Sequence, residues 1–320
     1  AVTVGGFPSS GGGTTPPPTT VDGVPVTTEP GPGGSTIVTI PVVVPTRPDT
    51  PGTSTPLADI PLVTSPSGSP IVSVSVPTGV GLQAEGLTTT TTGSAALAEL
   101  GFRIERIAGD NPELTNAGQV FYATLAPNEP LSVQILKPTI GAGYDASQPL
   151  VINGSSNAAD GKQAVIVDAR ALPSGTVIQV DNIEFIAVVG NVRLVGGAGQ
   201  NAASGDGAAQ WIVLGPDDDV IHGGGGNDTV GSEAGDDQVY GDAGDDIVFG
   251  GAGNDLLSGG IGSDRLNGGT GFDVAIQEGA RTDYTVTLEG AGIKLTHTAS
   301  GVSDWLVDVE QVRFATGASL

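Results

Sequence analysis

The chain of 320 residues has no cysteine and no methionine, and aromatic residues account for only 4% of it. Without cysteine, disulfides and thiolate-bound metals are excluded. The 11 Lys and Arg residues are outnumbered by 35 Asp and Glu, and the formal charge of −24 excludes a basic nucleic-acid-binding protein. No apolar run approaches the length of about 18 residues that indicates a membrane-spanning helix. The sequence starts without methionine and shows no signal-peptide pattern at Ala1, so we expect a trimmed chain or part of a longer protein.

Glycine and acidic residues are abundant, and the acidic residues are unevenly distributed. The chain has 52 glycines, and residues 196–276 contain 14 acidic residues against one basic residue, Arg265, a difference of 13 negative charges. Unneutralised acidic residues at this density are typical of disordered segments. Their regular spacing indicates an ordered structure instead.

A nine-residue repeat begins at Gly223, and six nonapeptides follow one another without insertion over residues 223–276. The fourth position is always glycine and the eighth is always apolar. The same register extends back to residue 196, with Asp219 at the sixth position of 214–222 but Gln210 and Asn201 in the two preceding repeats. The sixth position is aspartate in all six nonapeptides: Asp228, Asp237, Asp246, Asp255, Asp264 and Asp273.

Each repeat predicts a six-residue turn followed by a three-residue strand. Glycine permits the positive φ angles and the close backbone approach of such turns. One inward apolar side chain per repeat forms a core only when successive turns stack into a solenoid. Stacked aspartates would repel one another, so a cation must lie between them. Because the available ligands are carboxylate and backbone oxygens, without His or Cys, they select Ca²⁺ over Zn²⁺ or Mg²⁺.

These repeats resemble the RTX (repeats-in-toxin) family, whose motif GGxGxDxUx is matched over 223–276 and loosely from 196. The resemblance implies an all-β fold, a parallel β-roll with Ca²⁺ between turns 18 residues apart. Asp228, Asp246 and Asp264 would stack on one edge of the roll. The stack on the other edge would consist of Asp219, Asp237, Asp255 and Asp273.

The resemblance also implies that backbone carbonyls of the first four turn positions share in binding the ions. In this sequence they are Gly223, Gly224, Gly225, Gly226, Gly241, Gly244, Gly250, Gly251, Gly253, Gly259, Gly260, Gly262 and Gly268. The fifth-position residues are additional candidate ligands: Asn227, Asp236, Asp245 and Asn254.

Pairing neighbours on each edge gives about five Ca²⁺ sites: 219/237, 237/255, 255/273, 228/246 and 246/264. Gly215-Pro216-Asp217 replaces the glycine-rich turn beside the first of these sites, and residues 196–213 are expected to be metal-free. At millimolar calcium, five such sites would contribute on the order of 5–10 kcal/mol, comparable with the stability of a domain. We therefore expect an all-or-none switch, with a chain unfolded in the low-calcium cytosol and folded outside the cell.

The roll is expected to be flanked by further β structure. Short Val/Ile-rich strands in 162–195 predict metal-free solenoid turns, one short helix is expected in 94–106, and the rest of 81–160 is expected to be β-rich. Alternating apolar residues in 283–298 predict a hairpin, and 305–314 a further strand. The segment after the roll also resembles the one that closes RTX rolls, which implies an uncleaved type I secretion signal there.

Residues 1–80 are rich in Pro, Thr and Val and predict an extended arm. Two Val/Ile-rich stretches bounded by proline, 35–46 and 69–78, favour strands at sheet edges. Two interpretations remain open, a semi-rigid stalk or strands that dock on another subunit's sheet edge. The expected organisation is an arm (1–80), a β-rich domain leading into metal-free turns (81–195), the calcium-binding roll (196–276), and a cap with the secretion signal (277–320).

Catalytic motifs are absent from the sequence. The only histidines, His222 and His297, lie in strand-like segments, and neither HExxH nor GxSxG occurs. Acid pairs such as Asp245 and Asp246 are explained by calcium binding rather than by acid–base catalysis. We therefore expect that the protein is not an enzyme.

The sequence supports three functional hypotheses. The first is a secreted calcium-dependent structural protein that self-assembles into a surface layer, sheet or fibre, with copies of itself as partners through the 1–80 arm and the roll faces. The second is a fragment of an RTX adhesin, with 81–195 as its binding module. The third is the secretion and folding half of a larger RTX enzyme or toxin. All three place the protein at or outside the surface of a Gram-negative-type bacterium, reached by type I secretion, with no nucleic acid partner and no membrane span.

Overall fold

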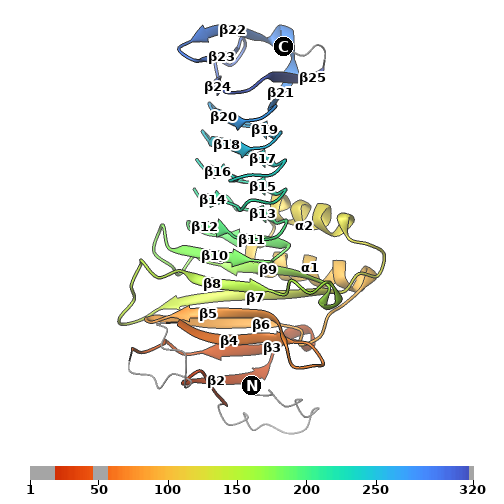
Figure 1. Ribbon diagram of the computed structural model, residues 1–320, viewed down its shortest axis with the longest axis vertical. Coiled ribbons are helices and arrows are strands. Elements are labelled where there is room, and N and C mark those ends of the chain that lie inside the picture. Colours follow the sequence, from red (N-terminus) through yellow and green to blue (C-terminus); the bar gives the residue numbers. More distant parts are fainter. Residues whose placement is uncertain (1–18, 46–56, 317–320) are drawn as a thin grey trace.

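The computed structural model describes residues 19–45 and 57–316, which form one elongated body built on two facing sheets (Figure 1). The N-terminal half contributes the longer strands: β1 (Thr19–Val21), β2 (Val24–Pro30), β3 (Thr36–Ile40), β4 (Leu57–Thr64), β5 (Pro70–Pro77), β6 (Val80–Gly86), β7 (Leu131–Ile140), β8 (Leu150–Gly154), β9 (Lys162–Asp168), β10 (Val177–Asp181), β11 (Phe185–Val189) and β12 (Arg193–Gly196). Short 3₁₀ turns lie at Pro32–Gly34, Ala158–Asp160 and Arg281–Asp283.

The nonapeptides form the β-roll, in which short strands alternate between the two sheets: β13 (Ala202–Ser204), β14 (Trp211–Val213), β15 (Val220–His222), β16 (Thr229–Gly231), β17 (Gln238–Tyr240), β18 (Ile247–Ala252), β19 (Leu256–Ser258), β20 (Arg265–Thr270) and β21 (Val274–Ala280). Each strand from β13 to β19 pairs in parallel with the strand one full turn later, as Val230 pairs with Val248. The eighth-position side chains fill the space between the sheets and are at most 1% exposed. The predicted all-β parallel roll is therefore confirmed.

Four strands close the C-terminal end: β22 (Tyr284–Glu289), β23 (Gly292–His297), β24 (Ser303–Val307) and β25 (Gln311–Thr316). The hairpin of β22 and β23 falls where the sequence predicts one. β24 adds in parallel to β20, and β25 adds in parallel to β21, so one sheet of the roll receives β25 and the other receives β24 with the β22–β23 hairpin beside it. We call residues 277–316 the cap, since they cover the last turn of the roll.

Each sheet runs the length of the molecule. Among the described residues, one sheet has 13 strands in the order β1-β2-β3-β6-β7-β9-β11-β13-β15-β17-β19-β21-β25. The other has 12 strands in the order β22-β23-β24-β20-β18-β16-β14-β12-β10-β8-β5-β4. A single hydrophobic core lies between the sheets and extends from Val24 to Phe314. Strand pairing changes from antiparallel to parallel at β7 in the first sheet and at β8 in the second.

The predicted N-terminal arm is wrong for the described part of 1–80. β3 pairs with β6, and β5 pairs with β4 and β8, so these strands belong to the chain's own two sheets. Their apolar residues are buried: Val74 and Val76 belong to the core between the sheets, and Val72 packs with Val63 and Ile71 in a separate small cluster. The edge positions expected for 35–46 and 69–78 are also wrong, because β3 lies between β2 and β6 and β5 lies between β4 and β8. The expectations for residues 1–18 and 46–56 lie outside the described residues.

Two helices pack on the outer face of the 13-stranded sheet (Figure 1). Helix α1 (Gly93–Ala108) falls where the sequence predicts one, but α2 (Pro112–Thr124) lies in a region expected to be β-rich. Asn111 caps α2 by accepting a hydrogen bond from the Leu114 N–H, and Pro112 suits the first helical turn. Neither described helix combines the length and apolarity needed to cross a membrane.

Candidate metal centre

The sixth-position aspartates form two ladders, one along each edge of the roll. At each step the Oδ1 atom of one aspartate accepts a hydrogen bond from the backbone N–H of the aspartate one turn earlier. The N–H of Asp228 donates to Asp246 at 2.7 Å, and that of Asp246 donates to Asp264 at 2.9 Å. On the other edge the corresponding distances from Asp219 to Asp237, from Asp237 to Asp255 and from Asp255 to Asp273 are 2.7, 2.9 and 2.9 Å. The structure thus places the aspartates in the two stacks that the family resemblance implies.

Both ladders continue into the cap through residues that the sequence analysis missed. The N–H of Asp264 donates to Asp304 Oδ1 at 3.0 Å, and the N–H of Asp273 donates to Glu310 Oε2 at 2.7 Å. The sequence does contain a signal for these two acids. Each precedes a buried apolar residue by two positions, which is the spacing between the sixth and the eighth position of a nonapeptide. Cap acids were overlooked because the nonapeptide period is interrupted before them.

The second carboxylate oxygen of most ladder aspartates is buried without a hydrogen-bond partner. This applies to the Oδ2 atoms of Asp228, Asp237, Asp246, Asp255, Asp264 and Asp273. A buried carboxylate oxygen without a donor is costly unless a cation compensates for the lost hydration. The orphaned oxygens therefore mark where positive charge belongs.

A backbone carbonyl faces the orphaned oxygen across the first glycine of the turn. A Cβ atom built on Gly241 would lie 2.5 Å from Asp246 Oδ2 and 2.6 Å from the carbonyl oxygen of Gly259 in the next turn of the same edge. At Gly223 the same two kinds of oxygen, from Asp228 and Gly241, lie at 2.8 and 2.6 Å. Glycine thus leaves open a space lined by oxygen atoms, and this donor set suits Ca²⁺.

Burial shifts the ladder carboxyl groups away from their ordinary acidity. Desolvation, with a smaller contribution from neighbouring carboxylates, raises the pKa of Asp219, Asp228 and Asp264 to about 7. The same causes raise the pKa of Asp237, Asp246 and Asp255 to about 6. The backbone N–H bond to each carboxylate opposes the shift. The metal-free ladders are therefore electrostatically strained at neutral pH, and a bound dication would relieve that strain.

No group of three or more His, Asp or Glu side chains converges on a metal position within residues 19–45 and 57–316. The ladders explain this result, since each space receives one orphaned carboxylate oxygen and its other oxygens come from the backbone. Calcium sites of mixed carboxylate and carbonyl character are common for this hard ion.

The predicted site between Asp219 and Asp237 differs from the others. Ser232 replaces the first glycine of its turn, and its hydroxyl lies 2.9 Å from the Gly215 carbonyl oxygen and 3.4 Å from Asp219 Oδ2. Asp219 Oδ2 is therefore not orphaned. The turn that contains Gly215 offers no first-position glycine, so the oxygen-lined space is not formed there.

The fifth-position residues form a separate outer ladder rather than entering the oxygen-lined spaces. Asn227 Oδ1 accepts from the N–H of Asp245 at 3.1 Å, and Asp236 Oδ1 accepts from the N–H of Asn254 at 2.8 Å. These contacts are exposed to solvent and clamp one turn to the next. Carbonyls at the second position also accept hydrogen bonds from the next turn of the same edge. The Gly224 carbonyl, for example, accepts from the N–H of Ala243 at 2.8 Å.

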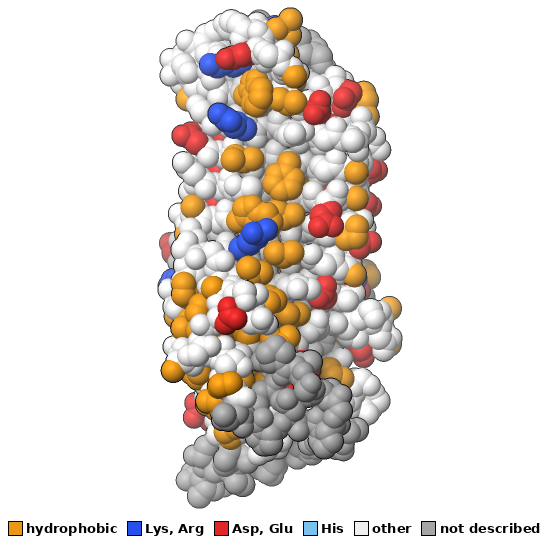
Figure 2. Space-filling model, turned by 60° about the vertical axis from the view of Figure 1, so that its left-hand side comes forward, with side chains coloured by type: hydrophobic (Ala, Val, Ile, Leu, Met, Phe, Trp, Pro, Cys, Tyr) orange, Lys and Arg blue, Asp and Glu red, His pale blue; other side chains and the backbone are white. Residues whose placement is uncertain are grey.

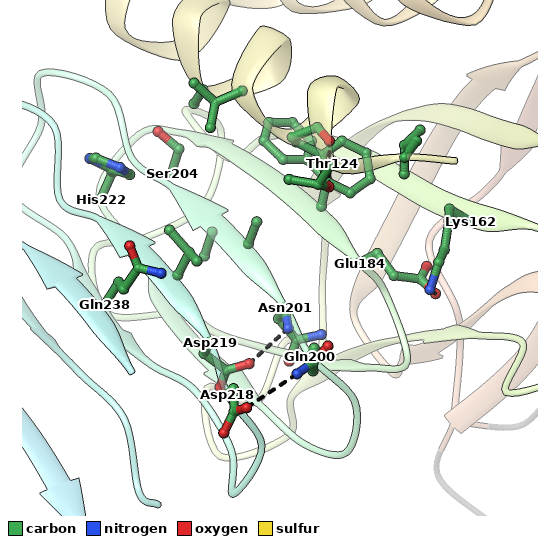
Figure 3. Close-up of a pocket in the computed structure, with 18 of the residues that line it drawn as sticks. Thr124, Lys162, Glu184, Gln200, Asn201, Ser204, Asp218, Asp219, His222 and Gln238 are labelled. Carbon is green, nitrogen blue, oxygen red and sulfur yellow. Dashed lines mark hydrogen bonds and ion pairs between the residues drawn. The ribbon is translucent and has the colours of Figure 1, made fainter. Parts of the chain in front are cut away.

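A groove of about 660 Å³ lies between α2 and the outer face of the 13-stranded sheet (Figure 3). Ser204, His222 and Gln238 project from the strands below the helix, and the ring of His222 stacks on Tyr240 at 4.5 Å. Lys162 is the only basic residue in the lining, and it pairs with Glu184 at 3.3 Å. The acids in the lining disfavour an anionic ligand: Glu113, Glu129, Glu184, Asp218, Asp219, Asp236 and Asp242.

The two-sheet roll and its aspartate ladders define a calcium-binding β-roll. The model of the RTX calcium-binding nonapeptide repeat (4 copies) matches residues 204–239 and 240–275. Residues 204–275 are therefore RTX calcium-binding nonapeptide repeats. Comparisons with curated proteins and with solved structures found no match.

Proposed function

We propose that this chain is a non-enzymatic structural protein that is secreted by a type I system, folds its roll on binding calcium outside the cell, and self-assembles there. The observation that carries the proposal is the double ladder of buried carboxylates with orphaned oxygens. Such ladders are unstable without cations, so the fold depends on the calcium concentration around the protein. RTX repeats are typical of secreted proteins, which supports the proposed location.

The calcium-dependent folding is tested by circular dichroism with excess calcium and then with a chelator. The spectrum is expected to lose β-sheet signal when calcium is removed and to regain it on re-addition. An unchanged spectrum in the chelator would refute the folding switch.

The self-assembly is supported by the outer face of the 12-stranded sheet. Two columns of side chains run along this face through β12, β14, β16, β18, β20 and β24, and neither contains an acidic residue. Figure 2 shows a band of hydrophobic side chains with Lys and Arg beside it, while acidic side chains lie mostly toward the sides. In a chain of net charge −24, two copies repel least where they meet through columns that contain no acids.

The order of residues in one column also suits a second copy. Reading from β12 to β24, the column is Arg193, Trp211, Thr229, Ile247, Arg265 and Trp305. Arg193 already stacks on Trp211 within the chain, with 3.7 Å from the guanidinium carbon to the ring centroid. If a second copy lies antiparallel on this face, each arginine of one copy meets a tryptophan of the other, and cation–π contacts form across the interface. Self-complementarity of this kind is what a two-fold interface requires.

The assembly is tested with electron microscopy and sedimentation in calcium. Ile247 is 48% exposed on this face, and Ile261 is 70% exposed in a turn away from it. Ile247→Asp is expected to abolish calcium-dependent assembly, whereas the matched variant Ile261→Asp is expected to assemble normally. Wild-type protein that remains monodisperse at high concentration with calcium would overturn the proposal.

The groove beneath α2 favours a second candidate, the binding module of an RTX adhesin. Its lining of Asn, Gln, Ser and His side chains, with the stacked rings of Phe121 and Phe185, suits a neutral ligand rich in hydroxyl groups. Binding to an array of neutral oligosaccharides by a protein that stays monomeric would favour this candidate over self-assembly.

A further inference from the structure

The cap holds Asp273, the last aspartate of its ladder, through the short segment 308–311. The backbone N–H groups of Glu310 and Gln311 both donate to the carbonyl of Asp273 at 3.1 Å. The N–H of Asp273 in turn donates to Glu310 Oε2 at 2.7 Å. Glu310 thus takes the place that the next aspartate takes at every earlier step of the ladder.

The carbonyl of Asp308 provides the second feature of a ladder site. A Cβ atom built on Gly268 would overlap the Asp308 carbonyl oxygen and would lie 2.5 Å from Asp273 Oδ2. Within the roll, the corresponding carbonyl comes from the first glycine of the next turn, as Gly259 provides it beside Gly241. Asp273 is fully buried, and its Oδ2 atom has no hydrogen-bond partner. The cap therefore reproduces the oxygen-lined space of the repeats with residues that are not part of any repeat.

We propose that the cap completes a calcium site at Asp273, with the Asp308 carbonyl and the Glu310 carboxylate as its contribution. The proposal rests on calcium binding by the roll. An ion at this position would be held by the repeat and the cap together, so binding it would fasten the cap onto the end of the roll. A first-position glycine stands beside an orphaned aspartate oxygen and a backbone carbonyl at Asp228, Asp246, Asp255 and, through the cap, Asp273, so the site in the cap is the fourth of this kind.

The opposite edge of the roll provides an internal comparison. Asp304 accepts the ladder hydrogen bond from Asp264 at 3.0 Å, just as Glu310 does from Asp273. However, the three atoms nearest to a Cβ built on Gly259 all belong to Asp264, whereas the atom nearest to a Cβ built on Gly268 is the Asp308 carbonyl oxygen. The side chain of Gln277 also hydrogen-bonds to Asp304. A cap carbonyl is thus the closest neighbour of the first glycine on the Asp273 edge, whereas the Asp264 side chain is the closest on the other edge.

The test counts bound calcium per chain in the full-length protein, by native mass spectrometry and equilibrium dialysis at saturating calcium. Glu310→Gln keeps an oxygen for the Asp273 N–H but removes the charge, and it is expected to lose one ion. Asp304→Asn is the matched control on the other edge and is expected to keep every ion.

A second pair of variants, both at Asp308, tests the role of the Asp308 backbone carbonyl. Asp308 has a φ of 49°, which aspartate and glycine tolerate but β-branched residues do not. Asp308→Gly removes the carboxylate, keeps the backbone and is expected to bind the full number of ions. Asp308→Val displaces the carbonyl and is expected to lose one ion.

Hydrogen exchange at saturating calcium shows whether the lost ion belongs to the cap. In Glu310→Gln, the amides of β25 are expected to exchange about tenfold faster while β17 and β19 stay protected. An unchanged ion count in both Glu310→Gln and Asp308→Val, or unchanged protection of β25, would overturn the proposal. A wild-type chain that binds no calcium would contradict the proposed function itself, and the two failures are therefore distinguishable.

Discussion

At the scale of single residues, the roll depends on two positions of the repeat, the glycine that begins each turn and the aspartate at the sixth position. Most ladder aspartates use one oxygen to hold the preceding turn and leave the other without a protein partner. The first glycine of the turn keeps the space beside that second oxygen open. Ser232 takes this position in the turn that holds Asp237, and its hydroxyl reaches Asp219 Oδ2 at 3.4 Å.

A methyl group at Gly241 is therefore expected to eliminate one calcium ion. Its Cβ would lie 2.5 Å from Asp246 Oδ2 and 2.6 Å from the Gly259 carbonyl oxygen, the two atoms that line the space. Gly207→Ala is the control, because a Cβ there has nothing within 4 Å. Isothermal titration should show one site fewer in Gly241→Ala, and equal stoichiometry in both variants would contradict this account.

The raised pKa values predict opposite effects of acid with and without calcium. In the metal-free roll, burial raises the pKa of Asp228 to about 7 and that of Asp246 to about 6, above the ordinary 3.8. The folded state then binds more protons than the unfolded state, so the free energy of unfolding rises as the pH falls through this window. With calcium bound, protons compete with the ion and acid destabilises the roll.

Thermal melts of the roll near pH 5 and near pH 8 test this prediction. In a chelator the acidic sample is expected to be the more stable one, and in calcium the order is expected to reverse. The same order in both conditions would show that the carboxylates do not carry the calcium dependence.

At the scale of elements, strand and turn signals were readable wherever the sequence repeats. The apolar eighth position of each nonapeptide predicts which side chain of the strand is buried, and these side chains are buried in the structure. Helix α2 was missed because its start depends on the cap at Asn111 and its apolar side packs on β11 and β13. In the N-terminal region the sequence favoured strands only where β3 and β5 lie, and their partners could not be predicted because they are far away in sequence, as β8 is from β5.

Helix α1 is anchored by a buried arginine. Arg103 is 1% exposed, and its guanidinium contacts Glu85 on β6 at 3.5 Å and Glu99 at 2.5 Å. Arg106 and the Ser35 hydroxyl also contact the Glu85 carboxylate. Removing one partner of a buried pair leaves an uncompensated charge, which costs about 3–5 kcal/mol.

Glu85→Gln is therefore expected to destabilise the N-terminal half by about 3 kcal/mol, since Glu99 still compensates part of the charge. Urea denaturation at fixed calcium measures the change. Asp168→Asn serves as the control, because its ion pair with Arg170 is exposed and is expected to contribute about 1 kcal/mol at most. Equal effects of the two variants would rule out an anchoring role for the buried pair.

At the scale of the whole molecule, the two halves differ in what holds them together. All five residues of β11 are buried, whereas a roll strand such as β17 buries one residue in three. The N-terminal half therefore contributes more apolar burial per residue to the shared core, and it adds a second cluster beneath the two helices. The roll has little apolar burial per residue and many buried carboxylates.

Removal of calcium is therefore expected to unfold the roll and leave the N-terminal half folded, rather than to unfold the entire chain. Hydrogen exchange in a chelator measures this directly. Amides of β15 to β20 are expected to lose protection, while those of β7, β9 and β11 keep it. Loss of protection in all of these strands at the same calcium concentration would instead support the all-or-none switch expected from the sequence.

The sequence by itself determined the repeat register, the aspartate stacks and the choice of calcium, because these depend on residues at a fixed short spacing. Only the tertiary structure decided which stacked pairs form an oxygen-lined space, since that depends on atoms brought together from distant parts of the chain. Ser232 closes one such space, and the cap opens another through Asp308 and Glu310. The two long sheets likewise depend on pairing between strands that are far apart in the sequence. This pairing incorporates the N-terminal strands, where the composition indicated a free arm.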